Sequence, residues 1–296
     1  MTWNRFTTWV ETHRHHLLDL IRNYLGVGLV IKGIFYLSNP AQIAPGVTPN
    51  WLSSIAPIVP YILILGGALL AIGLLTRLAA LAQMPIVFGA LSFIHLPFMD
   101  QSMAAREDVE FSALVLFLLA VIAIVGPGPL SLAERTGYKL DFAPARFRTW
   151  SHTRADYYMD AIRIYLGLGL FIKGFYILNH QQEFGQLLEE NSMPFGILAL
   201  AHYVIPAHFV GGAMLLFGFI TRAAAISQLP LLIGAVFYLY LPRFTSLELR
   251  QNLEFSALVL FLLAIISVAG AGRISIDYAA QRNYRLHEPD ISPARA

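Results

Sequence analysis

The stretch RNYLGVGLVIKG at residues 22–33 returns as RIYLGLGLFIKG at residues 163–174, and this repetition decides the fold. A second stretch, EFSALVLFLLA, occurs at 110–120 and again, without a change, at 254–264. The order of the two stretches is the same in both halves of the chain, and their spacing is nearly so. Such self-similarity indicates one structural unit that is written twice.

The composition is that of a membrane protein. Of the 296 residues 57% are hydrophobic and 13% are charged, whereas a soluble domain has roughly 45–50% apolar and about 25% charged residues. This composition excludes an ordinary soluble enzyme, and the formal net charge of +2 is too small for a nucleic-acid-binding surface. The chain has no cysteine, which excludes disulfides, iron–sulfur clusters, thiolate metal sites and cysteine-attached haem.

Eight apolar runs are candidate membrane spans, because about 20 apolar residues suffice to cross a bilayer as a helix. Their approximate bounds are 17–37, 57–75, 78–98, 109–126, 159–178, 198–220, 223–241 and 253–270. The second and third spans meet at Thr76-Arg77 and the sixth and seventh at Thr221-Arg222, so a tight turn is predicted at each motif. Each copy of the repeat holds an even number of spans, so both copies begin on the same side of the membrane. We therefore expect an all-α, polytopic membrane protein of eight transmembrane helices, arranged as two parallel four-helix bundles that are related by a pseudo-twofold axis along the membrane normal.

These spans divide the chain into five segments. They are an amphipathic N-terminal segment at 1–16, a first four-helix bundle at 17–135, an interfacial linker at 136–158, a second bundle at 159–280 and a tail at 281–296. In the first segment Trp3, Phe6 and Trp9 recur at helical spacing beside basic residues, which is typical of a helix that lies on the membrane surface.

The distribution of positive charge sets the orientation of the chain. Most Lys and Arg residues, including Arg77 and Arg222, lie at one set of helix ends, whereas the loops at 38–56 and 179–195 have none. Because cytoplasmic loops carry an excess of Lys and Arg, both termini and the linker are predicted to be cytoplasmic. The partners that this arrangement implies are the lipid bilayer and bound lipids, with no nucleic acid.

Two of the three lysines in the chain, Lys32 and Lys173, occupy the same position of the repeat, inside a predicted span. A lysine in the hydrocarbon region costs several kcal/mol unless it pairs or reaches water. Glu110 and Glu254 begin the fourth and eighth spans and are expected at a comparable depth. We therefore predict that Lys32 pairs with Glu110 in the first bundle and that Lys173 pairs with Glu254 in the second.

Other polar residues are expected at the same level. Arg106 and Arg250 each stand four residues before a glutamate, one helical turn away. His95 ends the third span where the second copy has Tyr240, and His208 enters the sixth span. Two interpretations stay open: a polar pocket that binds a quinone head group or relays protons, and a structural ion pair that joins helices. No metal site and no catalytic residue is predicted.

Glycines recur along the predicted spans and favour close contact between helices, since small residues let two backbones approach. The predicted packing positions are Gly26, Gly28, Gly33, Gly66, Gly67, Gly167, Gly169, Gly174, Gly211 and Gly212. Pro85 and Pro230 stand at matching places in the third and seventh spans, where we expect each of them to kink its helix.

Together these motifs resemble the DoxX/DoxD-like family of small membrane proteins. The resemblance rests on Arg-x-Tyr-Leu-Gly-x-Gly-Leu-x-x-Lys-Gly, Gly-Gly before Thr-Arg-x-Ala-Ala, Gln-x-Pro before Gly-Ala, and Glu before an apolar run into Gly-Pro-Gly-Pro-Leu-Ser. It covers roughly 17–135 and 159–280. Family members usually have one four-helix unit, so the resemblance implies a tandem fusion of two.

The resemblance also implies a function. It implies an integral subunit, in a bacterial or archaeal inner membrane, of a quinone-linked oxidoreductase such as thiosulfate:quinone oxidoreductase or of another electron-transfer complex. Other membrane subunits would be its partners and quinone the cofactor that it contacts, with no covalently bound cofactor. Two alternatives stay open. One is a structural or assembly subunit without a redox role, and the other is a small-solute transporter, which parallel bundles without broken helices disfavour.

Overall fold

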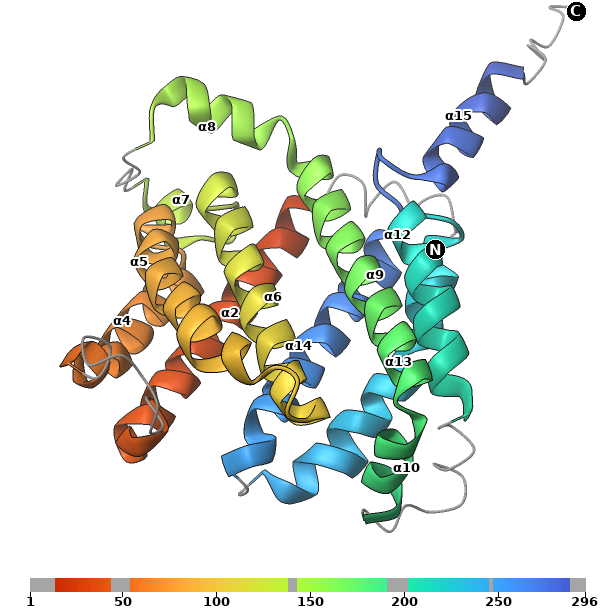
Figure 1. The fold of residues 1–296 in the computed structure, drawn as a ribbon. Helices are drawn as coiled ribbons and strands as arrows, with labels where there is room; N and C mark the ends of the chain where they lie inside the picture. The colour runs from red at the N-terminus through yellow and green to blue at the C-terminus, as the bar shows by residue number, and fades with distance from the viewer. Residues whose placement is uncertain (1–13, 44–53, 138–142, 191–201, 245–246, 288–296) are drawn as a thin grey trace, which may run out of the picture.

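The computed structural model describes residues 14–43, 54–137, 143–190, 202–244 and 247–287. Within these ranges all regular structure is helical (Figure 1), as the composition predicts. Six helices are long and apolar enough to cross a membrane, and they coincide with six of the eight predicted spans. Shorter apolar helices, Ala56–Ile72 and His202–Phe217, stand at the predicted second and sixth spans.

The two halves repeat the same order of main helices, and they differ in the short segments between the first two. The first half holds α2 (Arg14–Ser38), η1 (Pro40–Gln42), η2 (Ala56–Ile58), α4 (Val59–Ile72), α5 (Thr76–Gly89), η3 (Ala90–His95), η4 (Leu96–Phe98) and α6 (Met103–Val125). The second half holds α9 (Ala155–Asn179), α10 (Gln181–Glu190), η5 (Ala207–Gly211), α12 (Gly212–Phe217), α13 (Thr221–Gly234), η6 (Ala235–Tyr240), η7 (Leu241–Arg243) and α14 (Leu247–Ala269). Three further helices of the described residues lie outside the spans: α7 (Leu132–Thr136), α8 (Ala145–His152) and α15 (Ile276–His287).

The predicted tight turns before the two Thr-Arg motifs are confirmed. Gly73 ends α4 with a φ of 73°, and Gly218 ends α12 with a φ of 67°, which is the left-handed conformation that glycine adopts without strain. Leu75 and Ile220 also have positive φ values, 51° and 45°. A side chain in this region costs roughly 1–2 kcal/mol. Both halves therefore hold the same strained turn at the same motif.

Neither internal proline ends its helix. Pro85 lies within α5 and Pro230 within α13, and each helix continues as a π-helical segment, η3 or η6. Such π turns are rare and frequently stand at functional sites. The two segments end at His95 and Tyr240, which both reach the sites described below.

Most of the predicted packing glycines lie where two helices touch. A Cβ added to Gly26 would stand 2.7 Å from the carbonyl oxygen of Gly67, and one added to Gly67 would stand 2.7 Å from that of Gly26. Gly167 and Gly212 repeat this backbone contact between α9 and α12. The others that face a neighbouring helix are Gly33, Gly66, Gly174 and Gly211.

The prediction that Gly28 and Gly169 pack against a neighbouring helix is wrong. A Cβ at either position would meet nothing within 4 Å, and both glycines line cavities instead. The reason is helix geometry: residues two apart are separated by about 200° around the axis, so Gly26 and Gly28 cannot face the same neighbour.

This difference predicts opposite effects of one substitution at two neighbouring positions. Gly167→Leu is expected to lower the free energy of unfolding by about 1–3 kcal/mol, because the side chain would overpack the contact with α12. Gly169→Leu is expected to leave stability nearly unchanged, since it projects into open space. Thermal unfolding of the two variants in detergent measures both effects, and equal losses would contradict the assignment.

The two halves meet through the four helices that carry the lysines and glutamates. Helix α6 packs against α14, α2 packs against α14, and α9 packs against α6. The ring of Tyr24 stacks on Phe261 with centroids 4.3 Å apart, and Tyr165 stacks on Phe117 at 4.4 Å. Each lysine helix thus contacts the glutamate helix of the other half.

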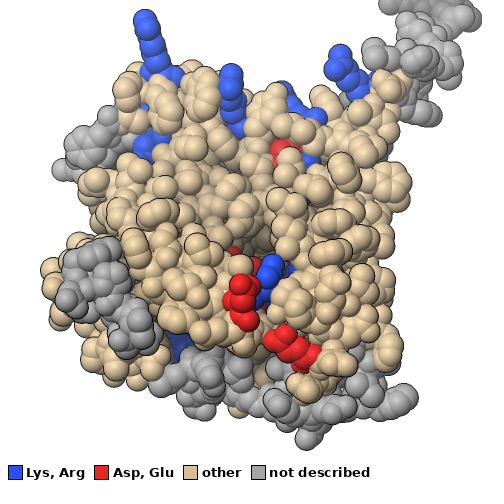
Figure 2. Space-filling model, in the orientation of Figure 1, with Lys and Arg blue, Asp and Glu red and all other residues tan. Residues whose placement is uncertain are grey.

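Charge is distributed unevenly over the face of the molecule that Figure 2 shows. Figure 2 shows Lys and Arg side chains gathered at the end where α7, α8 and α15 lie in Figure 1. A broad belt of mainly uncharged side chains follows, interrupted by a hollow with side chains of both charges. The predicted segment at 1–16 falls largely outside the described residues, as do parts of the linker and tail, so the five-segment division stays a prediction.

Candidate functional site

The first candidate site surrounds Lys173 of α9. Its Nζ lies 2.8 Å from Oε1 of Glu107 and 3.4 Å from Oε2 of Glu110, both on α6. Tyr240, at the end of η6, donates its hydroxyl to Oε2 of Glu107 at 3.0 Å. Arg106 lies 3.3 Å from Oε1 of Glu110, as their four-residue spacing predicts. Two cations and two carboxylates therefore balance one another in a site with little exposure to solvent.

The second candidate site surrounds Lys32 of α2. Its Nζ lies 2.9 Å from Oε2 of Glu254 and donates to Oε1 of Gln251 at 2.9 Å, both on α14. Arg250 lies 3.3 Å from Oε1 of Glu254. The ammonium group also stands 5.6 Å from the ring centroid of Phe111. This contact is a cation–π interaction, which stabilises a cation at an apolar surface.

The predicted pairs of Lys32 with Glu110 and of Lys173 with Glu254 are therefore wrong. Each lysine pairs with a glutamate of the other half. A lysine paired with a glutamate at a comparable depth was predicted. The partner was not determined by the sequence, because Glu110 and Glu254 occupy the same position of the repeat. The choice between them depends on which helices meet, and α2 meets α14 where it carries Lys32.

Asp108 distinguishes the two sites. Its carboxylate lies 3.9 Å from Nδ1 of His95, at the end of η3, and it interacts electrostatically with Lys32. Its neighbours Glu107 and Glu110 contact Lys173 instead. Helix α6 therefore presents carboxylates to both sites.

The two sites differ further because the repeat is imperfect. The position of Glu107 is held by Gln251 in the second copy, and that of Asp108 by Asn252. His208 lines the Lys173 site, and its counterpart Leu63 is apolar. Glu107, Asp108 and Gln251 were missed in the sequence. The signal was three acidic residues, Glu107, Asp108 and Glu110, in four consecutive positions where the fourth predicted span begins.

A cavity adjoins each lysine. The cavity beside Lys173 has a volume of ≈ 420 Å³ and is lined by Tyr165, His208, Tyr240 and Gly169, among mainly apolar side chains. The cavity beside Lys32 has a volume of ≈ 600 Å³, and its lining residues include Tyr24, Tyr36, His95 and Gly28. Figure 2 shows charged side chains at a hollow in the belt of uncharged side chains, so these groups are accessible from that surface.

Each cavity has a polar end and an aromatic end. Tyr165 stands two helical turns before Lys173 on α9, and Tyr24 stands equally far before Lys32 on α2. Eight residues of helix span about 12 Å. Each tyrosine ring stacks on a phenylalanine of the other half, and each lysine pairs with a glutamate of the other half. Both copies of the repeat therefore contribute residues to both ends of each cavity.

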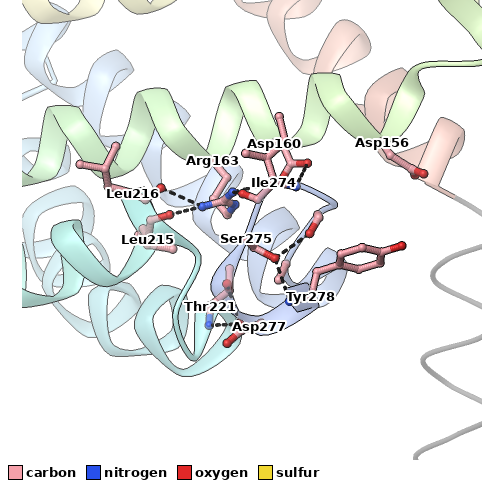
Figure 3. Close-up of polar contacts among 12 residues, drawn as sticks. Asp156, Asp160, Arg163, Leu215, Leu216, Thr221, Ile274, Ser275, Asp277 and Tyr278 are labelled. Carbon is pink, nitrogen blue, oxygen red and sulfur yellow. Dashed lines mark hydrogen bonds and ion pairs between the residues drawn. The ribbon is translucent and has the colours of Figure 1, made fainter. Parts of the chain in front are cut away.

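A second polar arrangement recurs where α2 and α9 begin, and it was missed in the sequence. Figure 3 shows Arg163 between the turn after α12 and the segment before α15. Its guanidinium lies 3.0 Å from Asp160 and donates to the carbonyls of Leu215 and Ile274. Asp160 in turn accepts from the backbone N–H of Ile274 at 2.9 Å. This cluster joins the start of α9 to two loops.

The first half holds the same cluster. Arg22 lies 3.1 Å from Asp19 and donates to the carbonyl of Leu70 at 2.7 Å, while Asp19 accepts from the N–H of Leu130 at 2.7 Å. Both arginines stand in the repeated stretch that decides the fold, but no partner was predicted for either of them. The signal was Asp-x-x-Arg in both copies, since residues three apart share one face of a helix.

Six long apolar helices and two lysine sites between repeated halves define a multi-pass helical membrane protein built from a duplicated unit. The family model described as DoxX matches residues 17–96 and 158–241, and the chain belongs to this family. One match falls in each half, which confirms the tandem duplication; α6 and α14, with their glutamates, lie beyond the matched residues. No curated protein and no solved structure matches the chain.

Proposed function

We propose that this protein is an integral, non-catalytic subunit of a quinone-linked electron-transfer complex and that its two cavities each hold a quinone head group. The observation that carries this proposal is an apolar cavity with a lysine at one end and a stacked tyrosine at the other, present twice. Ligand pockets of about 300–1,000 Å³ with few polar groups are typical sites for small molecules.

The lysines have hydrogen-bonding capacity for a quinone carbonyl. An ammonium group has three N–H donors. In the described part of the chain, Lys32 uses two of them on Glu254 and Gln251, and Lys173 uses two on Glu107 and Glu110. The third donor is available to an acceptor without loss of the ion pair. The chain contributes binding groups, and the electrons would pass through a partner subunit or the quinone itself.

We also infer that the two shorter helices cross the membrane, which gives eight spans in two parallel bundles related by a pseudo-twofold axis. Equivalent glycine contacts of α4 with α2 and of α12 with α9 support this arrangement. The concentration of Lys and Arg at the end with α7, α8 and α15 supports cytoplasmic termini in a bacterial or archaeal inner membrane.

Filling the cavities tests quinone binding directly. The probe is a benzoquinone with a decyl tail, bound to the purified protein in nanodiscs. Gly169→Leu and Gly28→Leu are each expected to remove one of two binding equivalents, and the double variant to remove both, because the new side chains would occupy space that the cavities leave open. Quenching of intrinsic fluorescence measures the binding.

The matched control is Gly185→Leu on α10, a position with open space outside both cavities. It should bind quinone like the unaltered protein. Undiminished binding by the double variant would show that the cavities are not the quinone sites. Mass spectrometry of chains that co-purify after gentle detergent extraction tests the subunit role separately.

A structural or assembly role is the second candidate, and one observation favours it. Both lysine–glutamate pairs bridge the halves, so they fix how the two copies pack whether or not a ligand binds. In that case the unaltered protein binds no quinone, and cavity-filling variants assemble with their partners as before.

A further inference from the structure

The turn before α13 is capped by a carboxylate that the first half lacks. Asp277 of α15 accepts from the backbone N–H groups of Ile220 and Thr221 at 2.7 and 2.9 Å and from the hydroxyl of Thr221 at 2.9 Å (Figure 3). One carboxylate thus satisfies three donors at the start of α13. Such donors otherwise have no partner within the helix, and the helix dipole favours an anion there.

In the first half, Ala133 occupies the place of Asp277. Three matched hydrogen bonds establish the equivalence. The N–H of Ala133 donates to Gly73 as that of Asp277 donates to Gly218, and the N–H groups of Leu130 and Ile274 donate to equivalent aspartates. Ser131 and Ser275 accept from the N–H three residues further on. An alanine side chain cannot accept a hydrogen bond, so the cap is missing.

The donors at the start of α5 nevertheless have the same geometry. Leu75 and Ile220 share the left-handed conformation, so the N–H groups that follow point in equivalent directions. Thr76 is 2% exposed, and within the described residues its Oγ1 is buried without a hydrogen-bond partner. Leaving such a group unsatisfied costs about 1–3 kcal/mol. The hydroxyl therefore indicates a missing acceptor.

A cavity of ≈ 1180 Å³ opens at this position and has room for that acceptor. Leu75, Thr76 and Ala133 line it together with Arg148 of α8. No ion pair of Arg148 is found among the described residues, so its guanidinium adds positive charge to the cavity. Glu134 also lines the cavity, and it is the one carboxylate among the described residues of the lining. It stands at the position of Tyr278, not at that of Asp277.

The remaining walls are mainly apolar, although Arg77 and a few other polar side chains also line them, and they lead to the exposed side of α5. Leu78 and Leu81 line the cavity and are 51% and 55% exposed. Phe147 of α8 lines it as well. An anion with an attached acyl chain fits this arrangement, since its charged group would meet the start of α5 and its chain would lie along the exposed leucines.

We propose that the phosphate of an anionic phospholipid binds at the start of α5, in the place that Asp277 fills in the second half. The phosphate accepts from the N–H groups of Leu75 and Thr76 and from the hydroxyl of Thr76, with Arg148 as its counter-ion. The site is independent of the two quinone cavities.

Exchanging the cap between the halves tests this proposal on the full chain. Native mass spectrometry measures the binding of phosphatidylglycerol, with phosphatidylcholine and inorganic phosphate as separate arms. Ala133→Asp supplies the missing carboxylate. It is expected to weaken phosphatidylglycerol binding about tenfold, because the new carboxylate would accept from the N–H groups that otherwise bind the phosphate. Asp277→Ala removes the acceptor from the equivalent N–H groups in the second half and is expected to add a second binding equivalent. Thr76→Val, which keeps the shape, should weaken binding as well.

The controls decide between the sources of the anion. Undiminished phosphatidylglycerol binding by both Ala133→Asp and Thr76→Val would overturn the proposal. Equal stabilisation of the unaltered protein by inorganic phosphate would overturn the assignment to a lipid. Asp141 lies outside the described residues, and phosphatidylglycerol binding that appears only in Asp141→Asn would show that an internal carboxylate fills the site.

Discussion

Lys173→Met is expected to lower the free energy of unfolding by about 3–5 kcal/mol, because it leaves Glu107 and Glu110 in a largely buried site without the cation between them. The loss arises mainly from Glu107, for which Lys173 is the paired cation in the described part of the chain, whereas Glu110 keeps its pair with Arg106. Lys173→Arg should recover much of the stability, since it restores the charge. Thermal or denaturant unfolding of the purified protein measures both variants.

A double-mutant cycle shows which carboxylate is the partner. Lys173→Met combined with Glu107→Gln should give a coupling energy of about 0.5–3 kcal/mol, as groups in direct contact do. The same cycle with Glu254→Gln should be additive, because Glu254 contacts Lys32 instead. Coupling of Lys173 to Glu254 and none to Glu107 would contradict the exchanged pairing.

Arg163→Ala is expected to destabilise the protein by a similar amount, about 3–5 kcal/mol, because Asp160 would remain buried without its counter-charge. Arg163 is 1% exposed, and it also satisfies carbonyl groups at two loops. Arg163→Lys should restore little, since an ammonium cannot reach separate acceptors as the planar guanidinium does.

The matched control is Arg273, which pairs with Asp156 at 2.8 Å but is 54% exposed. Its pairing with Asp156 raises the pKa of Arg273, yet an exposed pair contributes little to stability. Arg273→Gln should therefore unfold like the unaltered protein. A comparable loss of unfolding free energy in Arg163→Ala and Arg273→Gln would show that burial does not determine how much these arginines contribute to stability.

The exchanged pairing has a consequence for the duplication. Each lysine finds its carboxylate, and each tyrosine its stacking partner, in the other half. Neither half by itself completes a site. Joining two copies in one chain guarantees that the second copy is present, and it also allows the copies to differ, as Glu107 and Gln251 do.

Much of the fold could be predicted from the sequence. Apolar runs identified the long helices, the repeated motifs identified the duplication, and the Thr-Arg motifs identified the turns. These features depend on residues near in sequence and on the polarity of the surroundings. The π-helical segments could not be predicted, because they depend on what packs against the helix beyond Pro85 and Pro230.

The sequence alone determined that Lys32 and Lys173 need acidic partners, because an unpaired charge is costly in an apolar environment. Only the tertiary structure decided which partners they have. A duplicated sequence presents every group twice, so local pattern cannot choose between Glu110 and Glu254. The crossing of α2 with α14 and of α9 with α6 makes that choice.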